Sequence, residues 1–514
     1  MKKIYLLLSL SFLLTDCSWI DRFSNVEKKD VVEIKIPQAV KIDKNNLFTE
    51  SLIVKNFYNA NNYFTVWQTE TNRIQFLETI LTLEKEGVNV FKYDVSKLLF
   101  SNLHYDKLNI YERIQADFAY TNTFVSVLKQ LVHGKVNPNK YYSDWVAPQK
   151  DVNFNQVLLQ CLSEESVAET IKNNIPNNTY YNSIKEAISF YNELPEDTLL
   201  NLHYSDISKI KRKLNYFGDS NFSDFSNYAD ADFVVALKKF QKRHGIAPTG
   251  NVTAETLEAL NVSKEYRLKQ LRVNLERARW FYNEFGEHYV LVNIPECKLF
   301  LYSNGELIET HEVIIGKQDR KTPILSSVFS DIVINPTWTV PPTILKNDLV
   351  PKASANRGYF ASNRITIYNK SGNQVAPSDW DPSQYKNYRY VQKPGTWNAL
   401  GLIKFNFPNA HMVYLHDTSN RAAFNSKERV LSSGCVRVKD PFELATKIFE
   451  IEGLDYDQVK LDTLVAKEKT KVIPLNKKVN VHQLYWTAWK DDQGIQFRND
   501  IYLLDEGLYK KLVK

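Results

Sequence analysis

Apolar residues recur at three- and four-residue intervals through the first part of the chain. The segments 72–87 and 111–134 both show this spacing, which is typical of helices with one buried face. Each segment ends in glycine, a common helix stop. The spacing extends over most of residues 46–200, and no cluster of catalytic residue types occurs there. The pattern therefore predicts a helical scaffold domain.

Residues 202–262 contain three shorter helical patterns separated by turn-forming residues such as Pro248 and Gly250. This pattern predicts a compact unit of three helices. A basic segment with a stripe of apolar residues follows at 263–287. We interpret it as a connecting helix that packs on the scaffold and leads into the next domain.

Strand-like sequence begins at residue 288. It is rich in β-branched and aromatic residues and punctuated by Gly, Pro and Asn, which predicts a mostly β domain over 288–455. Residues 341–392 interrupt this domain, and a connection of that length is often a lid. Residues 456–514 form a C-terminal extension that we expect to pack on the β domain or on the scaffold. The predicted fold class is α+β with several domains.

The length of 514 residues and a hydrophobic fraction of 43% fit several globular domains. A net charge of +6 is mild for this length, and no Lys/Arg-rich run indicates nucleic-acid binding. Four cysteines are too few for a disulfide framework. We interpret Cys161 and Cys297 as buried core residues, with a bridge between them as the alternative.

The N-terminus has the pattern of an export signal. Lys2 and Lys3 precede an apolar run over 4–14 that is too short to span a bilayer comfortably. The end of the predicted signal peptide 1–17 resembles a lipoprotein cleavage box, whose Cys17 would carry lipid, although Asp16 is a poor match. A plain cleaved signal and an uncleaved anchor are the alternatives. Residues 18–45 would be a tether, and we expect a location in the periplasm or cell envelope.

His416 and Cys435 are the strongest candidates for catalysis. A thiol becomes a strong nucleophile as the thiolate, and a neighbouring imidazole commonly produces one. Tyr414 and His416 are two positions apart on a predicted strand, so their side chains should share a face. Gly434 lets the backbone beside Cys435 approach a substrate carbonyl closely. We therefore predict one site with a nucleophile, a base and an aromatic wall.

The order of the two residues narrows the class of thiol enzyme. Papain-like and other common wall cysteine peptidases place the Cys well before the His, and here the His comes first. Sortases also place the His first, but much farther upstream. The chain has no C-x-x-C or H-E-x-x-H motif for zinc, and we expect neither a metal nor an organic cofactor.

The segment from His416 to Ser432-Ser433-Gly434-Cys435 strongly resembles the L,D-transpeptidases, whose pattern is a His, a gap and then Ser/Thr-His-Gly-Cys. The resemblance extends to the large exported members of that family, which have a helical scaffold, a peptidoglycan-binding module and a capping insert. Segments that resemble further parts of this pattern are 240–257 in the module, 316–323, 335–342, 393–401 and 484–489.

The resemblance implies two acyl transfers. Cys435 would attack the third residue of a wall tetrapeptide and release D-Ala, and an amine of a second stem peptide would resolve the thioester. His416 would be the general base and acid, and N–H groups near Gly434 and Cys435 would form an oxyanion hole. Asp417 would orient His416, and its backbone carbonyl is favoured because adjacent strand side chains point to opposite faces. Peptidoglycan stem peptides and glycan are the implied partners, and carbapenems would acylate the thiol.

Four further residues are candidates for substrate binding. Tyr414 should line the pocket because it alternates with His416. Ser433 stands where the family has a second His, and it can offer only a hydroxyl. Arg437 could bind a substrate carboxylate or a structural carbonyl. Trp338 could contact the pocket or anchor the lid.

Two other functions stay open. Water in place of the amine would give an L,D-carboxypeptidase, and acceptor choice depends on pocket shape and water exclusion rather than on these motifs. A non-catalytic wall-binding protein is the third hypothesis. The intact His416, Gly434 and Cys435 argue against it.

Overall fold

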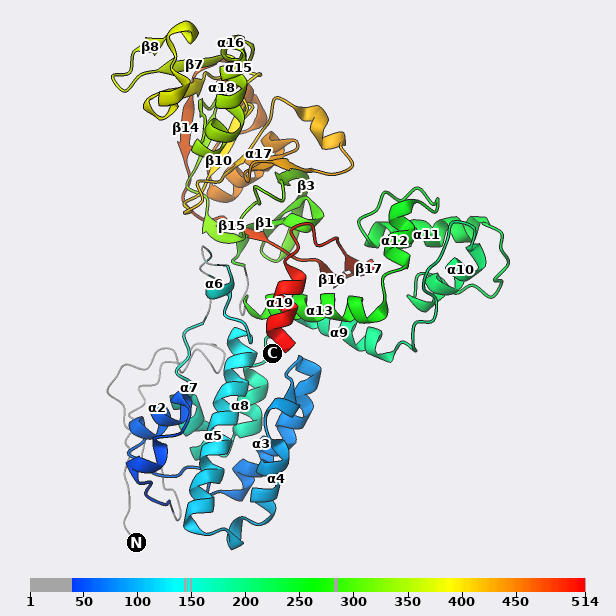
Figure 1. The fold of residues 1–514 in the computed structure, drawn as a ribbon, viewed down its shortest axis with the longest axis vertical. Helices are drawn as coiled ribbons and strands as arrows, with labels where there is room; N and C mark the ends of the chain where they lie inside the picture. Colours follow the sequence, from blue (N-terminus) through cyan, green and yellow to red (C-terminus); the bar gives the residue numbers. More distant parts are fainter. Residues whose placement is uncertain (1–38, 143–144, 146, 148–149, 282–284, 514) are drawn as a thin grey trace.

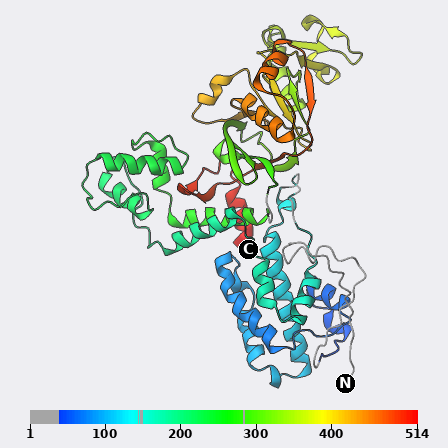
Figure 2. The same cartoon turned by 180° about the vertical axis from the view of Figure 1, so that it is seen from behind.

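The computed structural model describes residues 39–513 except 143–144, 146, 148–149 and 282–284. The predicted signal segment with Cys17, and the predicted tether up to residue 38, lie outside the described residues. Figure 1 shows a helical scaffold at one end, a β-rich domain at the other and a small helical module to one side, and Figure 2 shows them from behind. Within the described ranges, every helix is too short or too polar to span a lipid bilayer.

The predicted helical scaffold is present and has its own apolar core. Its longest helix, α5, begins at a capping box in which Asn109 Oδ1 accepts from the Glu112 N–H at 3.0 Å and Glu112 Oε2 accepts from the Asn109 N–H at 2.9 Å. The main scaffold helices are α2 (Leu52–Ala60), α3 (Glu70–Thr82), α4 (Val95–Leu103), α5 (Ile110–His133), α7 (Phe154–Ser163) and α8 (Val167–Asn173).

Helix α9 (Thr179–Glu193) falls inside the predicted scaffold range 46–200 but belongs elsewhere. Its buried residues Tyr181, Ile184 and Tyr191 share a core with the small module and with helix α13 (Lys264–Arg279). The predicted range 46–200 therefore includes a helix whose packing partners are the small module and α13. Helical spacing shows that a segment has a buried face and gives no information about which partner covers that face.

The three predicted helices of the small module are α10 (Ile207–Tyr216), α11 (Ala231–Arg243) and α12 (Ala254–Leu260). The buried Gln241 side chain holds the turn between the last two helices: its Nε2 donates to the Asn251 carbonyl at 2.8 Å, and its Oε1 accepts from the Gly250 N–H at 2.9 Å. The motif residues at 240–257 thus have a clear structural role in shaping the module.

The β-rich domain is a mixed sheet, and among the described residues it has eleven strands in the order β14-β5-β10-β11-β13-β3-β2-β1-β15-β4, with β12 paired to β3. Helix α17 (Pro441–Glu452) packs into its core through buried Leu444 and Ile448. The strands are β1 (His288–Asn293), β2 (Lys298–Ser303), β3 (Glu306–Gly316), β4 (Leu325–Val328), β5 (Asp331–Ile334), β10 (Ile403–Asn406), β11 (Leu415–His416), β12 (Val430–Ser432), β13 (Val436–Val438), β14 (Lys471–Pro474) and β15 (Asn480–Leu484).

The predicted end of this domain at residue 455 is wrong. Strand β15 lies between β1 and β4, and β14 pairs with β5, so the sheet needs residues that were expected to form a separate extension. Only the chain after β15 leaves the sheet. It forms the hairpin β16 (Ala488–Asp491) and β17 (Gly494–Phe497) and then helix α19 (Asp505–Val513), which lies beside α13 where the three parts meet (Figure 1).

The predicted insert 341–392 folds around its own apolar core, which includes the buried Trp380 and Tyr390. The unit starts slightly earlier than predicted, because Trp338 in strand β6 pairs with Gln392 in strand β9. Its small sheet consists of β6 (Trp338–Thr339), β9 (Arg389–Gln392), β7 (Ile365–Tyr368) and β8 (Gln374–Val375), and its helices include α15 (Val350–Ala355) and α16 (Gly358–Ser362).

A buried polar network ties the C-terminus to helix α13. Arg277 Nη1 donates to Asp505 Oδ1 at 2.6 Å, and Thr487 Oγ1 donates to Asp505 Oδ2 at 2.7 Å. The Thr487 hydroxyl also accepts from Asn274 Nδ2 at 2.8 Å. Because these groups are buried, each depends on its partner to replace lost hydration.

We expect Arg277→Ala to lower the free energy of unfolding by about 3–5 kcal/mol, because it leaves the Asp505 carboxylate buried without its cation. Urea unfolding followed by tryptophan fluorescence measures the loss. The double variant Arg277→Met with Asp505→Leu should recover most of it, since no charge then remains. An equal loss in both variants would contradict this account. Lys510→Ala, which removes an exposed ion pair to Glu506, is the control and should change little.

Candidate active site

Two neighbouring strands bring the predicted catalytic residues together. Strand β11 runs parallel to β13 with Leu415 opposite Val436, and both of these side chains are fully buried in the core. The Val436 N–H donates to the Tyr414 carbonyl at 3.2 Å, which continues the pairing toward Cys435. Because side chains alternate along strands, Tyr414, His416, Cys435 and Arg437 lie on the face opposite to the core.

The Cys435 thiol is half-buried beside Tyr414. Burial raises the pKa of this thiol above its usual value. The backbone N–H and the hydroxyl of Tyr414 lower the pKa of the thiol, as do the positive charges of Lys404 and Arg437. Together these effects are smaller than the effect of burial. At neutral pH the resting nucleophile is therefore mainly the thiol rather than the thiolate.

The imidazole of His416 is buried and held by its own chain. Its Nδ1 lies 2.5 Å from the carbonyl oxygen of Asp417, and a carbonyl can only accept, so Nδ1 carries the proton and Nε2 is free to act as a base. Burial, and after it the charge of Arg437, lowers the pKa of His416 to about 3. The ring packs edge-on against Tyr414 with 5.6 Å between centroids. The site thus rests as a neutral thiol and a neutral imidazole.

The hydrogen bond from His416 to the Asp417 backbone carbonyl is the one that strand alternation predicted. The Asp417 carboxylate points elsewhere and accepts from the Leu402 N–H at 2.9 Å. It fills the space beside Gly401, where any Cβ would come within 2.3 Å of a carboxylate oxygen. The Asp417 carboxylate therefore fixes the loop that contains Gly401 and Leu402. Asp417 contacts the His416 imidazole only through its backbone carbonyl.

The loop before Cys435 is held by its own hydrogen bonds. The Gly434 N–H donates to Ser432 Oγ at 3.1 Å, and that hydroxyl donates to the Cys435 carbonyl at 2.6 Å. The Gly434 N–H thus has an acceptor in this loop, and the oxyanion hole formed by N–H groups near Gly434 and Cys435 stays a prediction. The glycine is required by its φ of +114°, a backbone conformation that side chains rarely allow.

Ser433 contacts a residue that the sequence did not single out. Arg320 Nη1 donates to Ser433 Oγ at 3.0 Å and to Asp348 Oδ2 at 2.5 Å, and Nη2 donates to Asp348 Oδ1 at 3.1 Å. Since Asp348 belongs to the insert, Arg320 joins the insert to the loop of the nucleophile. We call this contact the latch. It is a tertiary contact between the 316–323 motif and the insert, and neither segment alone indicates it.

Lys404 is a second residue that sequence reasoning missed. It lies opposite His416 in the pairing of β10 with β11, and its Nζ is 3.9 Å from the centroid of the Tyr414 ring. Burial lowers its pKa. The alternation of buried Ile403 and Phe405 around it was the available signal, because it places Lys404 on the same face as the catalytic candidates.

The two remaining substrate-binding candidates also reach this face. Arg437 lies opposite His416, and its buried Nε has no hydrogen-bond partner among the described residues. Trp338 of the insert's small sheet acts on the Tyr414 hydroxyl and lowers its pKa, so Trp338 lies at the boundary between the insert's core and the site. The structure brings Trp338, Tyr414, His416, Ser433, Cys435 and Arg437 into one region, as expected.

A thiol directly before strand β13 and an imidazole on the neighbouring strand β11, joined to an insert through Arg320, define a cysteine-centred candidate catalytic domain. Residues 287–473 match the model of the L,D-transpeptidase catalytic domain, residues 53–188 match a scaffold domain, and residues 203–260 match a family named "Putative peptidoglycan binding domain". The chain therefore carries a catalytic domain of the L,D-transpeptidase family.

One curated relative and two solved structures are also similar to parts of this chain. A Haemophilus influenzae protein named "Putative L,D-transpeptidase" is 36% identical over 271 residues, which cover 51% of this chain and 54% of that protein. The chain thus spans about half the length of that relative. An L,D-transpeptidase structure from Stackebrandtia nassauensis has 15% identity and a TM-score of 0.21, covering 55% of this chain and 92% of that one. An Ldtfm–avibactam carbamoyl enzyme has 10% identity and a TM-score of 0.18, covering 41% and 61%.

The alkylation rate of Cys435 by iodoacetamide should rise about tenfold per pH unit between about pH 6 and 8, because little thiolate exists at neutral pH. Mass spectrometry of the intact protein gives the rate. Lys404→Met should slow the reaction further, since it removes a cation that favours the thiolate. A rate that is already constant near pH 6 would reveal a thiolate–imidazolium pair and refute the neutral pair. Cys161 and Cys297 are buried with raised pKa values, so with Cys17 replaced by Ser throughout, Cys435→Ala should label negligibly.

Proposed function

We propose that the protein is a cysteine-dependent L,D-transpeptidase that joins peptidoglycan stem peptides. The observation that supports this most is the placement of Cys435, directly before strand β13, beside His416 in the adjacent strand β11, with the proton on Nδ1 of His416 held by the Asp417 carbonyl. This arrangement leaves Nε2 as a base on the face of the thiol. The match of residues 287–473 to the L,D-transpeptidase catalytic domain supports peptidoglycan stem peptides as the proposed substrate class.

In the first step, Sγ of Cys435 attacks the carbonyl carbon of the third residue of a tetrapeptide while His416 Nε2 takes the thiol proton. Because both groups rest in their neutral forms, attack and proton transfer are coupled. The resulting imidazolium donates its proton to the nitrogen of the leaving D-Ala. The C–N bond breaks, and a thioester on Cys435 remains.

In the second step, an amine of another stem peptide attacks the thioester carbonyl. His416 takes a proton from that amine and returns it to the departing sulfur, which restores the thiol and the neutral imidazole. Negative charge develops on the carbonyl oxygen in both steps. Lys404 and Arg437 are the cations that act on Cys435, so they are the groups best placed to stabilise that charge electrostatically.

The latch supports an amine acceptor over water. Arg320 joins the insert to the Ser433 hydroxyl, and Trp338 joins it to Tyr414, so the insert contacts the site on two sides. An insert held in this way limits the entry of water to the thioester. An L,D-carboxypeptidase, in which water resolves the thioester, is the alternative outcome of the experiment below.

We also propose that the protein is exported and acts in the periplasm or cell envelope. The support is the basic and apolar pattern of residues 1–17, together with the proposed wall substrate. Membrane anchoring through lipid on Cys17 or through the N-terminal segment is part of this proposal.

Purified protein incubated with disaccharide-tetrapeptide should yield a crosslinked dimer that has lost one D-Ala, detected by mass spectrometry. Cys435→Ala should abolish the dimer, and His416→Gln should lower its rate by about 10²–10⁴-fold, because proton transfer loses its base. Tripeptide without dimer would favour the carboxypeptidase instead. Equal products from the wild type and Cys435→Ala would refute the nucleophile, whereas Cys161→Ala is the matched control and should retain full activity.

A carbapenem should acylate Cys435 and add its mass to the intact protein. The thiol would attack the strained lactam carbonyl as it attacks the tetrapeptide, and His416 would again take the proton. Peptide mapping of the adduct gives the position. An adduct on Cys161 or Cys297 would contradict the proposal, and Cys435→Ala should remain unmodified.

A further inference from the structure

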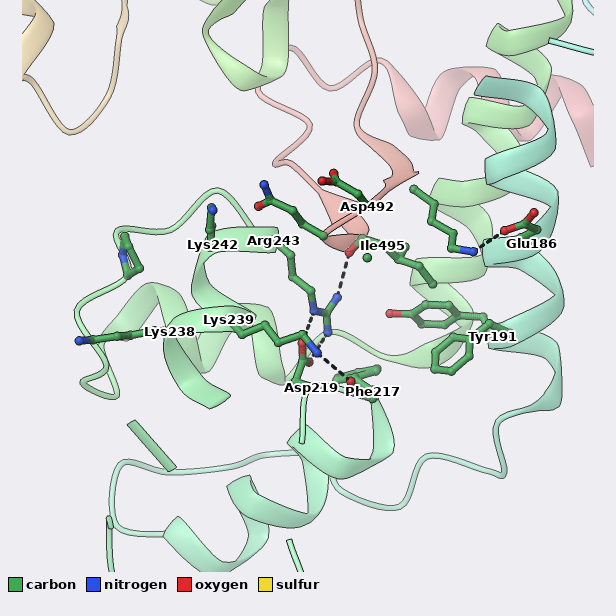
Figure 3. A pocket seen from close by; sticks show the side chains of 16 residues that line it. Glu186, Tyr191, Phe217, Asp219, Lys238, Lys239, Lys242, Arg243, Asp492 and Ile495 are labelled. Carbon is green, nitrogen blue, oxygen red and sulfur yellow. Dashed lines mark hydrogen bonds and ion pairs between the residues drawn. The ribbon is translucent and has the colours of Figure 1, made fainter. Parts of the chain in front are cut away.

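A hollow lies away from Cys435, where the small module meets the C-terminal hairpin. Its volume is about 720 Å³, within the usual range for small-molecule sites. Helix α9, the turn after α10, helix α11 and the hairpin β16–β17 all contribute to its lining, as Figure 3 shows. We call it the junction pocket. Only part of it belongs to the three-helix module, so the matched module alone could not form it.

The walls of the junction pocket are held by buried interactions. Arg243 of α11 donates to Asp219 through Nε at 2.6 Å and through Nη2 at 2.5 Å, and both side chains are buried. Its Nη1 donates to the Ile495 carbonyl of the hairpin at 3.2 Å. Figure 3 shows Arg243 between these two partners. The module and the hairpin are therefore fixed to each other, and the pocket does not depend on a flexible contact.

The chemistry of the lining is mixed. Phe190, Tyr191 and Phe217 give it an aromatic wall. Five basic side chains and three acidic ones surround it, which leaves an excess of positive charge. Arg243 is neutralised by Asp219 and Lys490 by Glu186. The pocket therefore suits a ligand with apolar groups and negative charge.

Two lysines on the same helix have no anionic partner among the described residues. Lys239 Nζ donates only to the neutral carbonyl of Gly218, at 3.2 Å, and Lys242 makes no ion pair. Both side chains are exposed at the edge of the pocket. Their charges are available to a bound anion and are not needed to hold the fold.

We propose that the junction pocket binds the carboxylates of peptidoglycan stem peptides, as a second wall-binding site outside the catalytic domain. Stem peptides carry carboxylates together with alanine methyl groups, which complement the basic edge and the aromatic wall. The pocket would hold the wall polymer while Cys435 acts on a neighbouring stem. The inference rests on the proposed wall substrate, but it does not require catalysis.

Co-sedimentation with purified sacculi tests the proposal in the Cys435→Ala background, where no turnover occurs. The double variant Lys239→Glu with Lys242→Glu should bind about tenfold more weakly, because attraction to carboxylates becomes repulsion. The matched control is Lys97→Glu with Lys107→Glu, two exposed lysines of the scaffold, which changes the net charge equally and should bind as before. Neutral Gln variants at 239 and 242 give an intermediate loss and remain informative if charge reversal perturbs folding.

Glycan strands stripped of their peptides identify the ligand group. They should bind all variants equally weakly, because the carboxylates are gone. If the Lys239/Lys242 variant lost binding to stripped strands as much as it lost binding to sacculi, the pocket would be a glycan site and the carboxylate assignment would be overturned. If this variant bound sacculi as well as the unaltered protein does, the proposed site itself would be overturned. With Cys435 restored, the same variant should process soluble disaccharide-tetrapeptide at the wild-type rate. Failure of the wild type in that assay would count against the proposed function alone.

Discussion

The pairing of Leu415 with Val436 is the constraint on which the site depends. Both side chains are buried in the core of the sheet, so the parallel strands β11 and β13 can pair in one register only. A shift of one residue would turn His416 and Cys435 into the core and bring apolar side chains to the catalytic face. The hydrophobic effect on one face of the sheet thus positions the polar chemistry on the other.

The same burial sets the electrostatics of the site. It raises the pKa of the Cys435 thiol and lowers that of the His416 imidazole, so both groups rest without charge. The cations of Lys404 and Arg437 act on the Cys435 thiol and favour negative charge there when it forms. An uncharged resting pair with fixed cations nearby suits a nucleophile that gives up its proton during attack.

The C-terminal part of the chain connects the domains. Strand β15 enters the catalytic sheet beside β1, and the hairpin that follows packs on the module and α9. Helix α19 is then fixed to α13 through Asp505 and Arg277. Tyr502, between the hairpin and this helix, also donates to the Gly316 carbonyl at 2.6 Å, which lies in the motif that carries Arg320. The position of the catalytic loop therefore depends on residues from nearly the end of the chain.

The sequence by itself determined the class of fold, the His416–Cys435 pair and the bond from His416 to the Asp417 carbonyl, because these follow from spacing and from the alternation of a strand. Tertiary structure alone decided the boundaries at α9 and β15, since periodicity shows a buried face and not its partner. It also decided the contact of Arg320 with Asp348 and Ser433, and the use of the Gly434 N–H by Ser432. Those interactions depend on which segments meet in space and on backbone angles, and short motifs specify neither.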